Sequence, residues 1–383
     1  MITALSPVTA RTLATSIVIG SCALLVLGVQ PVLLGAMVQE GRIAEAQVGN
    51  LVTIEMLAIV LGSLAGIALL RRMRARIVIG VAGLVLAAVN LAVTGQSGFA
   101  ILSSFRAIAG MSEGVLVASA LVAISRVERV ERASAVFLAV QTLLQAIVAA
   151  VLPFIVAGSS RTDTALMVLA IAGAMAATAT LSLPQHLHPT AADSERGALT
   201  LTSLTALCGA GLFLGAIVSL WSYFGLWLTL SGYPATFEGT AVSVCLVAQV
   251  VGALTAAHFG ERLPNRQTIF VCALTGGLLV ALFFVARGNA NAILAVSGAF
   301  GFVWLFTLPF FAGWLIDIDP GRRAVLYLTA FQLGGAALLP SIAGIAVGSS
   351  TVDAALVFSG TIFIVLAAVA AVGSRSTHRA LRL

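Results

Sequence analysis

The sequence has few charged residues: Asp, Glu, Lys and Arg make up 9% of its 383 residues, and none of them is a lysine. A typical soluble domain contains about 25% charged residues. Hydrophobic residues make up 60% of the chain, which is more apolar surface than a soluble fold of this size can bury. The scarcity of charge therefore excludes a cytosolic enzyme, a secreted domain, a disordered chain and a coiled coil. It predicts an integral membrane protein.

Motifs for metals, cofactors and covalent catalysis are also missing. The four cysteines all lie inside apolar runs, and none forms a CxxC or Cys/His cluster, so neither a disulfide framework nor a metal site is predicted. The sequence contains no Walker loop, no G-x-G-x-x-G before a helix, and no HExxH or Ser/His/Asp constellation. We therefore expect no cofactor, no metal, no ATP drive and no enzymatic activity. The excess of arginine is explained by membrane topology, so we expect no nucleic-acid partner.

Long apolar runs fill most of the chain. A bilayer core of about 30 Å needs about 20 apolar helical residues per crossing, and twelve stretches qualify. They cover residues 12–38, 47–70, 77–96, 99–124, 133–157, 164–183, 200–230, 239–258, 267–286, 290–316, 324–347 and 352–373. The predicted fold is all-α, with twelve transmembrane helices. The run from Phe302 to Phe311, which contains Pro309, predicts a broken tenth helix.

The arginines are sorted by side. If the N-terminus is cytoplasmic, sixteen arginines lie in inner loops or tails and three lie in outer loops. Short loops rich in arginine remain in the cytoplasm, so both termini are predicted to be cytoplasmic. Arg126, Arg129 and Arg132 belong to one of these inner loops, which we expect to contact anionic lipid headgroups.

The two halves of the chain resemble one another after a shift of 190 residues. Gly62 aligns with Gly252, Arg76 with Arg266, and Arg132 with Arg322. The one long polar loop lies between these halves. We therefore predict a six-helix bundle over residues 1–183, a cytoplasmic linker over 184–200, and a second six-helix bundle over 201–383.

Two parallel six-helix halves are typical of major facilitator transporters, and the chain resembles that superfamily over its whole length. The loop pattern of the family, G-x-L-a-D-r-x-G-r-R, is similar to the segment from Glu261 to Arg266. The first copy has Arg71 where the acid would fall. The resemblance implies a cytoplasmic gate formed by Arg72, Arg76, Glu261, Arg262 and Arg266.

Arg106 and Gly110 match the family's R-x-x-x-G pattern in helix 4. The antiporter pattern G-x-x-x-G-P-x-x-G is absent from helix 5, which weakens a drug-efflux interpretation.

Three ionisable residues lie deep within predicted spans: Glu55, Arg106 and Glu113. Such residues are costly in lipid and are candidates for function. Glu55 and Arg106 are at about equal depth, roughly 12 Å from the outer surface at 1.5 Å per residue, so they can form an ion pair. Glu113 is predicted to carry a coupling proton, with Glu55 as a second candidate. Arg106 is a candidate for binding a substrate carboxylate; a static ion pair that fixes helix packing is the alternative.

Deep amides and aromatic rings form a second group of candidate substrate contacts. They are Gln30, Gln141, Gln145, Gln249, Gln332, Trp221 and Trp304. Hydrogen bonds between helices are the alternative role for the amides.

These features predict a secondary transporter that works by alternating access near the bilayer midplane. The expected substrate is a small amphipathic organic solute, such as an organic acid, driven by protons. The alternatives are proton-driven efflux of drug-like or metabolite compounds and a facilitative carrier or channel. We expect a monomer in the lipid bilayer of a bacterial inner membrane, and a membrane-embedded enzyme would need a cluster of His, Asp or Cys that the spans lack.

Overall fold

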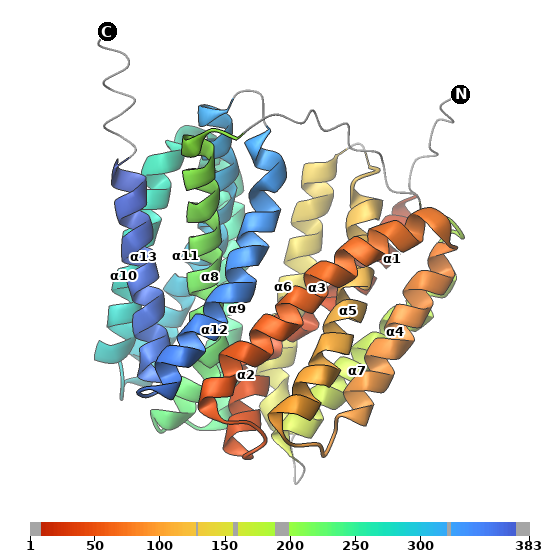
Figure 1. Ribbon diagram of the computed structural model, residues 1–383, viewed down its shortest axis with the longest axis horizontal. Coiled ribbons are helices and arrows are strands. Elements are labelled where there is room, and N and C mark those ends of the chain that lie inside the picture. The colour runs from red at the N-terminus through yellow and green to blue at the C-terminus, as the bar shows by residue number, and fades with distance from the viewer. Residues whose placement is uncertain (1–8, 128, 156–159, 188–198, 320–322, 373–383) are drawn as a thin grey trace. The chain divides into compact units, whose positions relative to one another are not determined.

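The computed structural model describes residues 9–127, 129–155, 160–187, 199–319 and 323–372. Most of the predicted linker and both chain termini lie outside these residues, so the predicted orientation of the termini stays a prediction. The described residues form helices and turns with no strand. Within each half of the chain, Figure 1 shows long helices running alongside one another.

The first half of the chain forms seven α-helices and two short 3-10 helices. They are α1 (Ala10–Ala23), α2 (Leu25–Gln39), η1 (Glu45–Gln47), α3 (Val48–Arg72), α4 (Ala75–Ala92), α5 (Phe99–Ile124), α6 (Val130–Ile155), α7 (Arg161–Ala179) and η2 (Thr180–Ser182). The second half forms α8 (Leu201–Leu230), α9 (Ala235–Phe259), η3 (Gly260–Arg262), α10 (Asn265–Val285), α11 (Ala290–Ile318), η4 (Ala324–Tyr327), α12 (Leu328–Gly348) and α13 (Asp353–Val372).

Twelve helical segments within the described residues are long and apolar enough to cross a membrane, which confirms the predicted number. The first segment consists of α1 and α2, which are separated by a break at Leu24. The predicted break in the tenth span is wrong, because α11 continues through Pro309 as one helix. Proline is tolerated in membrane helices where neighbouring groups satisfy the carbonyl that loses its partner.

Polar residues at the loop edges set several helix boundaries. The side chains of Ser160, Thr200 and Asn289 each accept a hydrogen bond from the backbone N–H three residues later. These are N-caps that satisfy donors left free at the start of a helix. Gly95 and Gly98 have positive φ angles of 71° and 96°, so the loop between α4 and α5 uses a conformation that glycine adopts without strain.

Contacts divide the chain into two compact units. The first unit contains Met1–Leu33 and Ile54–Ala192, and the second contains Leu34–Thr53 and Asp193–Leu383. In the first unit, α4 packs against α5 and α7, and α1 packs against α5, α6 and α7. In the second unit, α9 packs against α11, and α8 packs against α12 and α13. The predicted three-part division of the sequence stays a prediction, and the contacts add that residues 34–53 group with the second half.

Candidate functional site

Three neighbouring helices of the first unit place a cluster of polar side chains around Arg106. Its Nη2 atom forms an ion pair with Glu55 of α3 and lies 3.4 Å from Oε1 of Glu113, two turns further along α5. Its Nη1 atom donates a hydrogen bond of 2.9 Å to Oδ1 of Asn90 in α4. The ion pair expected from the equal depth of Glu55 and Arg106 is present. We call these four residues the charge cluster.

Small residues make this cluster possible by letting α3 and α5 approach closely. A Cβ atom added to Gly110 would lie 2.6 Å from the backbone oxygen of Glu55, and one added to Gly62 would overlap the backbone oxygen of Met111. Such contacts are shorter than any side chain at these positions could accept. The glycines therefore bring the two backbones near enough for Glu55 to reach Arg106.

All four residues of the charge cluster are buried, with relative exposures of 2% or less. Two carboxylates face a single guanidinium group, so the fully ionised cluster has a formal charge of −1. Oε2 of Glu113 and Nε of Arg106 have no hydrogen-bond partner among the described residues. An unpaired buried charge is expensive, and a proton bound to Glu113 would remove the imbalance.

Asn90 was not among the residues that the sequence singled out. Its Oδ1 accepts from Arg106, and its Nδ2 donates to the backbone oxygen of Leu86 at 2.9 Å, so both ends of the amide are used. The available signal was one amide inside the apolar run 77–96, whose other amide, Gln96, is the last residue of the run. That signal marks a polar position, but it does not identify the partner.

Two of the predicted aromatic contacts meet in the second unit. The rings of Trp221 in α8 and Trp304 in α11 form an edge-to-face pair with centroids 5.5 Å apart, and Trp221 also stacks on Phe224. Trp221 is buried and Trp304 is half-buried. Trp304 is therefore the more accessible ring of this aromatic pair, and Trp221 packs against it.

The five glutamines lie in different surroundings. In the first unit, the Nε2 atom of Gln145 donates to the backbone oxygen of Leu24 at 2.6 Å. This carbonyl lies at the break between α1 and α2 and also accepts a hydrogen bond of 3.1 Å from the backbone N–H of Leu27, so Gln145 adds a second bond there in a structural role. Gln141 is half-buried, and its Oε1 atom has no partner among the described residues.

Of the remaining three glutamines, two have a side-chain N–H donor without a partner among the described residues, and one is partly exposed. Gln30 in the first unit and Gln249 in the second are buried, and the Nε2 atom of each lacks a partner within the described part of the chain. Gln332 on α12 is half-buried.

Two of the predicted gate arginines bind helix ends instead of acids. The Nε atom of Arg76, at the start of α4, donates to the backbone oxygen of Leu183, directly after η2, at 2.6 Å. The Nε atom of Arg266, at the start of α10, donates to the backbone oxygen of Ala370 near the end of α13 at 2.7 Å. A cation at the carbonyl end of a helix is favourable. Arg76 therefore connects the start of α4 to the chain just after α7 and η2, and Arg266 connects the start of α10 to the end of α13.

The other three predicted gate residues are exposed. They are Arg72, Glu261 and Arg262. The guanidinium carbon of Arg262 lies 5.8 Å from the centre of the Phe259 ring. No hydrogen bond or ion pair joins these three side chains to one another in the described residues, and their role in gating remains a proposal.

The second unit repeats the helix packing of the charge cluster without its charges. A Cβ atom on Gly252 would overlap the backbone oxygen of Phe302, and one on Gly301 would overlap that of Cys245. At shifts of 190 to 191 residues, Cys245 matches Glu55 and Trp304 matches Glu113. The first unit therefore has carboxylates where the second has a thiol and an aromatic ring.

Comparison with known families identifies the architecture. The sequence model of the Major Facilitator Superfamily matches residues 13–323. The chain belongs to this superfamily. It is a multi-pass membrane protein with a transporter fold, as the sequence predicted. A search of curated proteins found no match.

Solved structures of other major facilitator transporters are similar over nearly the whole chain. Two structures of the nucleoside transporter NupG align with TM-scores of 0.78 and 0.76 at 15% and 16% identity. They cover 94% and 95% of this chain and 99% of each NupG chain. A bacterial homologue of the human lysosomal transporter Spinster, in an inward-facing and unoccupied conformation, aligns with a TM-score of 0.71 at 12% identity, covering 97% of this chain and 98% of that one. At such low identity, these similarities describe the fold alone.

Proposed function

We propose that this protein is a proton-coupled secondary transporter that moves a small amphipathic organic solute by alternating access. The observation that carries the proposal is the charge cluster, in which two buried carboxylates share one guanidinium group. The expected setting is the inner membrane of a bacterium, with the arginine-rich loops in the cytoplasm, and the expected active form is a monomer.

The charge balance links protonation to conformation. With a proton on Glu113, the cluster contains the neutral pair of Glu55 and Arg106, and it can remain buried. Without that proton, the cluster has an unbalanced negative charge, which favours a conformation that hydrates Glu113. A gradient of protons across the membrane can then bias the transport cycle in one direction.

Arg106 acts in this proposal as a fixed countercharge. Its two terminal nitrogens already contact Glu55, Glu113 and Asn90, so only its Nε atom is without a partner among the described residues. This arrangement supports a countercharge better than a clamp for a substrate carboxylate. Glu55 then keeps Arg106 in place, and Glu113 exchanges the proton.

The substrate class follows from the aromatic pair and the amides. The ring of Trp304, supported by Trp221, offers a flat apolar surface to a solute. Gln141 and Gln332 offer amide groups at half-buried positions. Nucleosides combine a flat ring with polar groups, and NupG shares this fold, so nucleosides join organic acids among the first solutes to test.

The experiment uses purified protein in proteoliposomes with an imposed pH gradient. The wild type should concentrate one of the tested solutes in response to the gradient. The Glu113→Gln variant keeps the size of the side chain but cannot exchange a proton, so it should lose driven accumulation and retain exchange of solute across the membrane. The control is Ser112→Ala, because the Ser112 hydroxyl already bonds to the backbone oxygen of Ile108; it should behave as wild type.

Each alternative function has its own outcome in this assay. Undiminished accumulation by Glu113→Gln would disprove the coupling role of that residue. Equilibration without concentration in the wild type would support a facilitative carrier. Accumulation that runs opposite to the proton flow, measured in vesicles of both orientations, would support efflux by proton exchange.

A further inference from the structure

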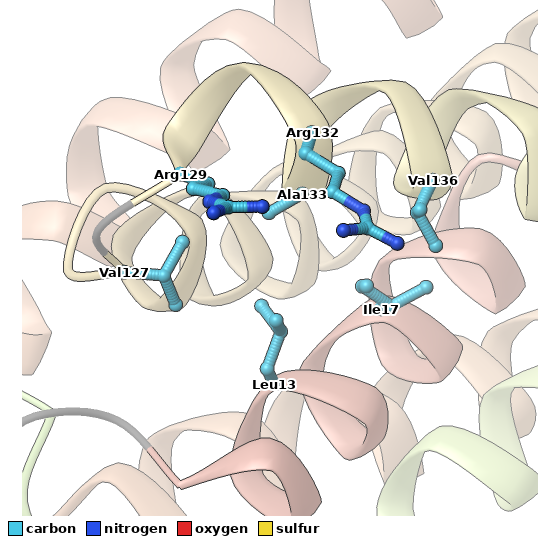
Figure 2. A pocket seen from close by; sticks show the side chains of 7 residues that line it. All are labelled: Leu13, Ile17, Val127, Arg129, Arg132, Ala133 and Val136. Atoms are coloured by element: carbon cyan, nitrogen blue, oxygen red, sulfur yellow. The ribbon is translucent and has the colours of Figure 1, made fainter.

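A hollow of about 230 Å³ lies at the arginine-rich end of the first unit. The first turns of α1, the first turns of α6 and the turn before α6 form its walls. It is lined by Leu13, Ile17, Val127, Arg129, Arg132, Ala133 and Val136. Figure 2 shows the two arginine side chains on one side of the hollow and Leu13 and Ile17 on the facing side. We call it the arginine crevice.

The floor of the arginine crevice is rigidly packed. Ile17 and Ala133 belong to a buried hydrophobic group with Ala120, Ile124 and Phe137. A Cβ atom on Gly20 would lie 2.7 Å from Cβ of Ala120 and 2.9 Å from Cε2 of Phe137, so α1 is held close to both neighbours. The crevice is therefore a depression between closely packed helices.

The charged side of the crevice is open to an anion. Arg129 and Arg132 are both exposed, and neither has a hydrogen bond or an ion pair with any side chain that the structure describes. The segment from Arg126 to Arg132 contains three arginines and two glutamates, so its formal charge is +1. Glu128 and the side chain of Glu131 lie outside the described residues. An anion approaching this segment meets a net positive charge.

The apolar walls indicate what kind of anion fits. Apart from the two guanidinium groups, the lining consists of Leu, Ile, Val and Ala, and Val136 is 45% exposed. A free inorganic anion would gain nothing from these walls, whereas each buried methylene group contributes about 0.8 kcal/mol. Since α1 begins at Ala10, Leu13 and Ile17 lie within about 11 Å of the start of the first candidate membrane span.

We propose that the arginine crevice binds one anionic phospholipid of the leaflet on the arginine-rich side. Arg129 and Arg132 hold its phosphate, and Leu13, Ile17 and Val136 contact the first methylene groups of an acyl chain. Guanidinium groups suit phosphate oxygens because they donate several hydrogen bonds in one plane. The site needs no assumption about substrate or proton coupling, so it stands or falls separately from the proposed function.

The second half of the chain does not repeat this site. At a shift of 190 residues, Arg129 matches Asp319. The Oδ2 atom of Asp319 accepts a hydrogen bond of 2.9 Å from the backbone N–H of Ala324. Asp319 therefore replaces one of the two arginines in the second half, and its carboxylate binds the first backbone N–H of η4. The lipid site is therefore specific to the first half.

The test is native mass spectrometry of the full chain in detergent, with phosphatidylglycerol and phosphatidylcholine of identical acyl chains. The wild type should retain one phosphatidylglycerol molecule at least fivefold more than phosphatidylcholine. The Arg129→Gln/Arg132→Gln variant should lose this preference. Val136→Trp should also lose it, because the indole fills the hollow while the charge of the protein is unchanged.

A matched control separates the crevice from general attraction to basic residues. Arg72→Gln/Arg74→Gln removes two exposed arginines from another loop of the same unit and should keep the retained lipid. Equal loss in both double variants, or full retention in Val136→Trp, would overturn the proposal. Displacement of the lipid by millimolar inorganic phosphate would show instead that the site accepts a free anion and would likewise overturn it.

Discussion

Asn90 provides the hydrogen-bond acceptor for the Nη1 atom of Arg106 through its Oδ1 atom. The guanidinium group is buried, so the loss of this acceptor would leave a charged donor without a partner. In the Asn90→Leu variant we expect the free energy of unfolding to fall by about 1–3 kcal/mol. Thermal unfolding in detergent would measure the change.

A suitable control for this prediction is the neighbouring residue Leu91, which is 54% exposed. Leu91→Ala should change stability by less than about 0.5 kcal/mol. If Asn90→Leu were no less stable than Leu91→Ala, the hydrogen bond from Arg106 to Asn90 would have no energetic importance.

At the residue scale, the sequence predicted charges more readily than amides. Glu55, Arg106 and Glu113 are conspicuous because ionisable groups are rare in spans, and their depth follows from counting residues. An asparagine costs less in lipid, so Asn90 has no comparable signal. Gln145 has the alternative role considered for the amides, a hydrogen bond between helices, but the sequence did not identify its partner, the backbone oxygen of Leu24.

At the scale of helices, glycine determines which pairs can pack closely. Gly62 in the first unit and Gly252 in the second each lie against a backbone oxygen, of Met111 and Phe302 respectively. Because a backbone oxygen cannot move aside as a side chain does, Gly62→Ala and Gly252→Ala should each lower the free energy of unfolding by about 1–3 kcal/mol.

Each unit supplies its own control for this prediction. A Cβ atom on Gly80 would lie 3.5 Å from Oγ1 of Thr180, and one on Gly298 would lie 3.4 Å from Cγ1 of Val244. Both are tolerable contacts, so Gly80→Ala and Gly298→Ala should leave the melting temperature nearly unchanged. Equal effects of all four substitutions would mean that helix propensity, and not close packing, determines the response.

The number and length of the helices follow from hydropathy, but their internal details do not. Pro309 shows why: the sequence predicts a break, whereas α11 is continuous from Ala290 to Ile318. Conversely, the break at Leu24 contains no proline. Whether a helix bends depends on the neighbours that satisfy its carbonyl groups, and a single sequence does not identify those neighbours.

At the scale of the whole molecule, the two halves share helix packing and differ in chemistry. The first has the charge cluster, and the second has the pair of Trp221 and Trp304. Under the proposed function, coupling and solute binding should therefore respond to different substitutions. Trp304→Leu should raise KM about tenfold, since the loss of ring stacking costs up to about 1.5 kcal/mol. Driven accumulation at saturating solute should persist.

The same transport assay measures this separation. Glu113→Gln should show the reverse pattern, with solute exchange retained and driven accumulation lost. Trp304→Phe retains a ring and should recover most of the affinity. An uncoupled Trp304→Leu variant with unchanged KM would contradict the assignment of solute stacking to Trp304.

The break in the first span has a consequence for motion. Leu24 interrupts the span, and Pro31 inside α2 has no backbone N–H to donate. Residues up to Leu33 belong to one compact unit and those from Leu34 to Thr53 belong to the other. An uninterrupted helix would resist bending, whereas the first span has two weak points, at Leu24 and at Pro31. Both lie before the boundary between Leu33 and Leu34. The amide of Gln145 donates a hydrogen bond to the backbone oxygen of Leu24, so that side chain restrains bending at the first of them.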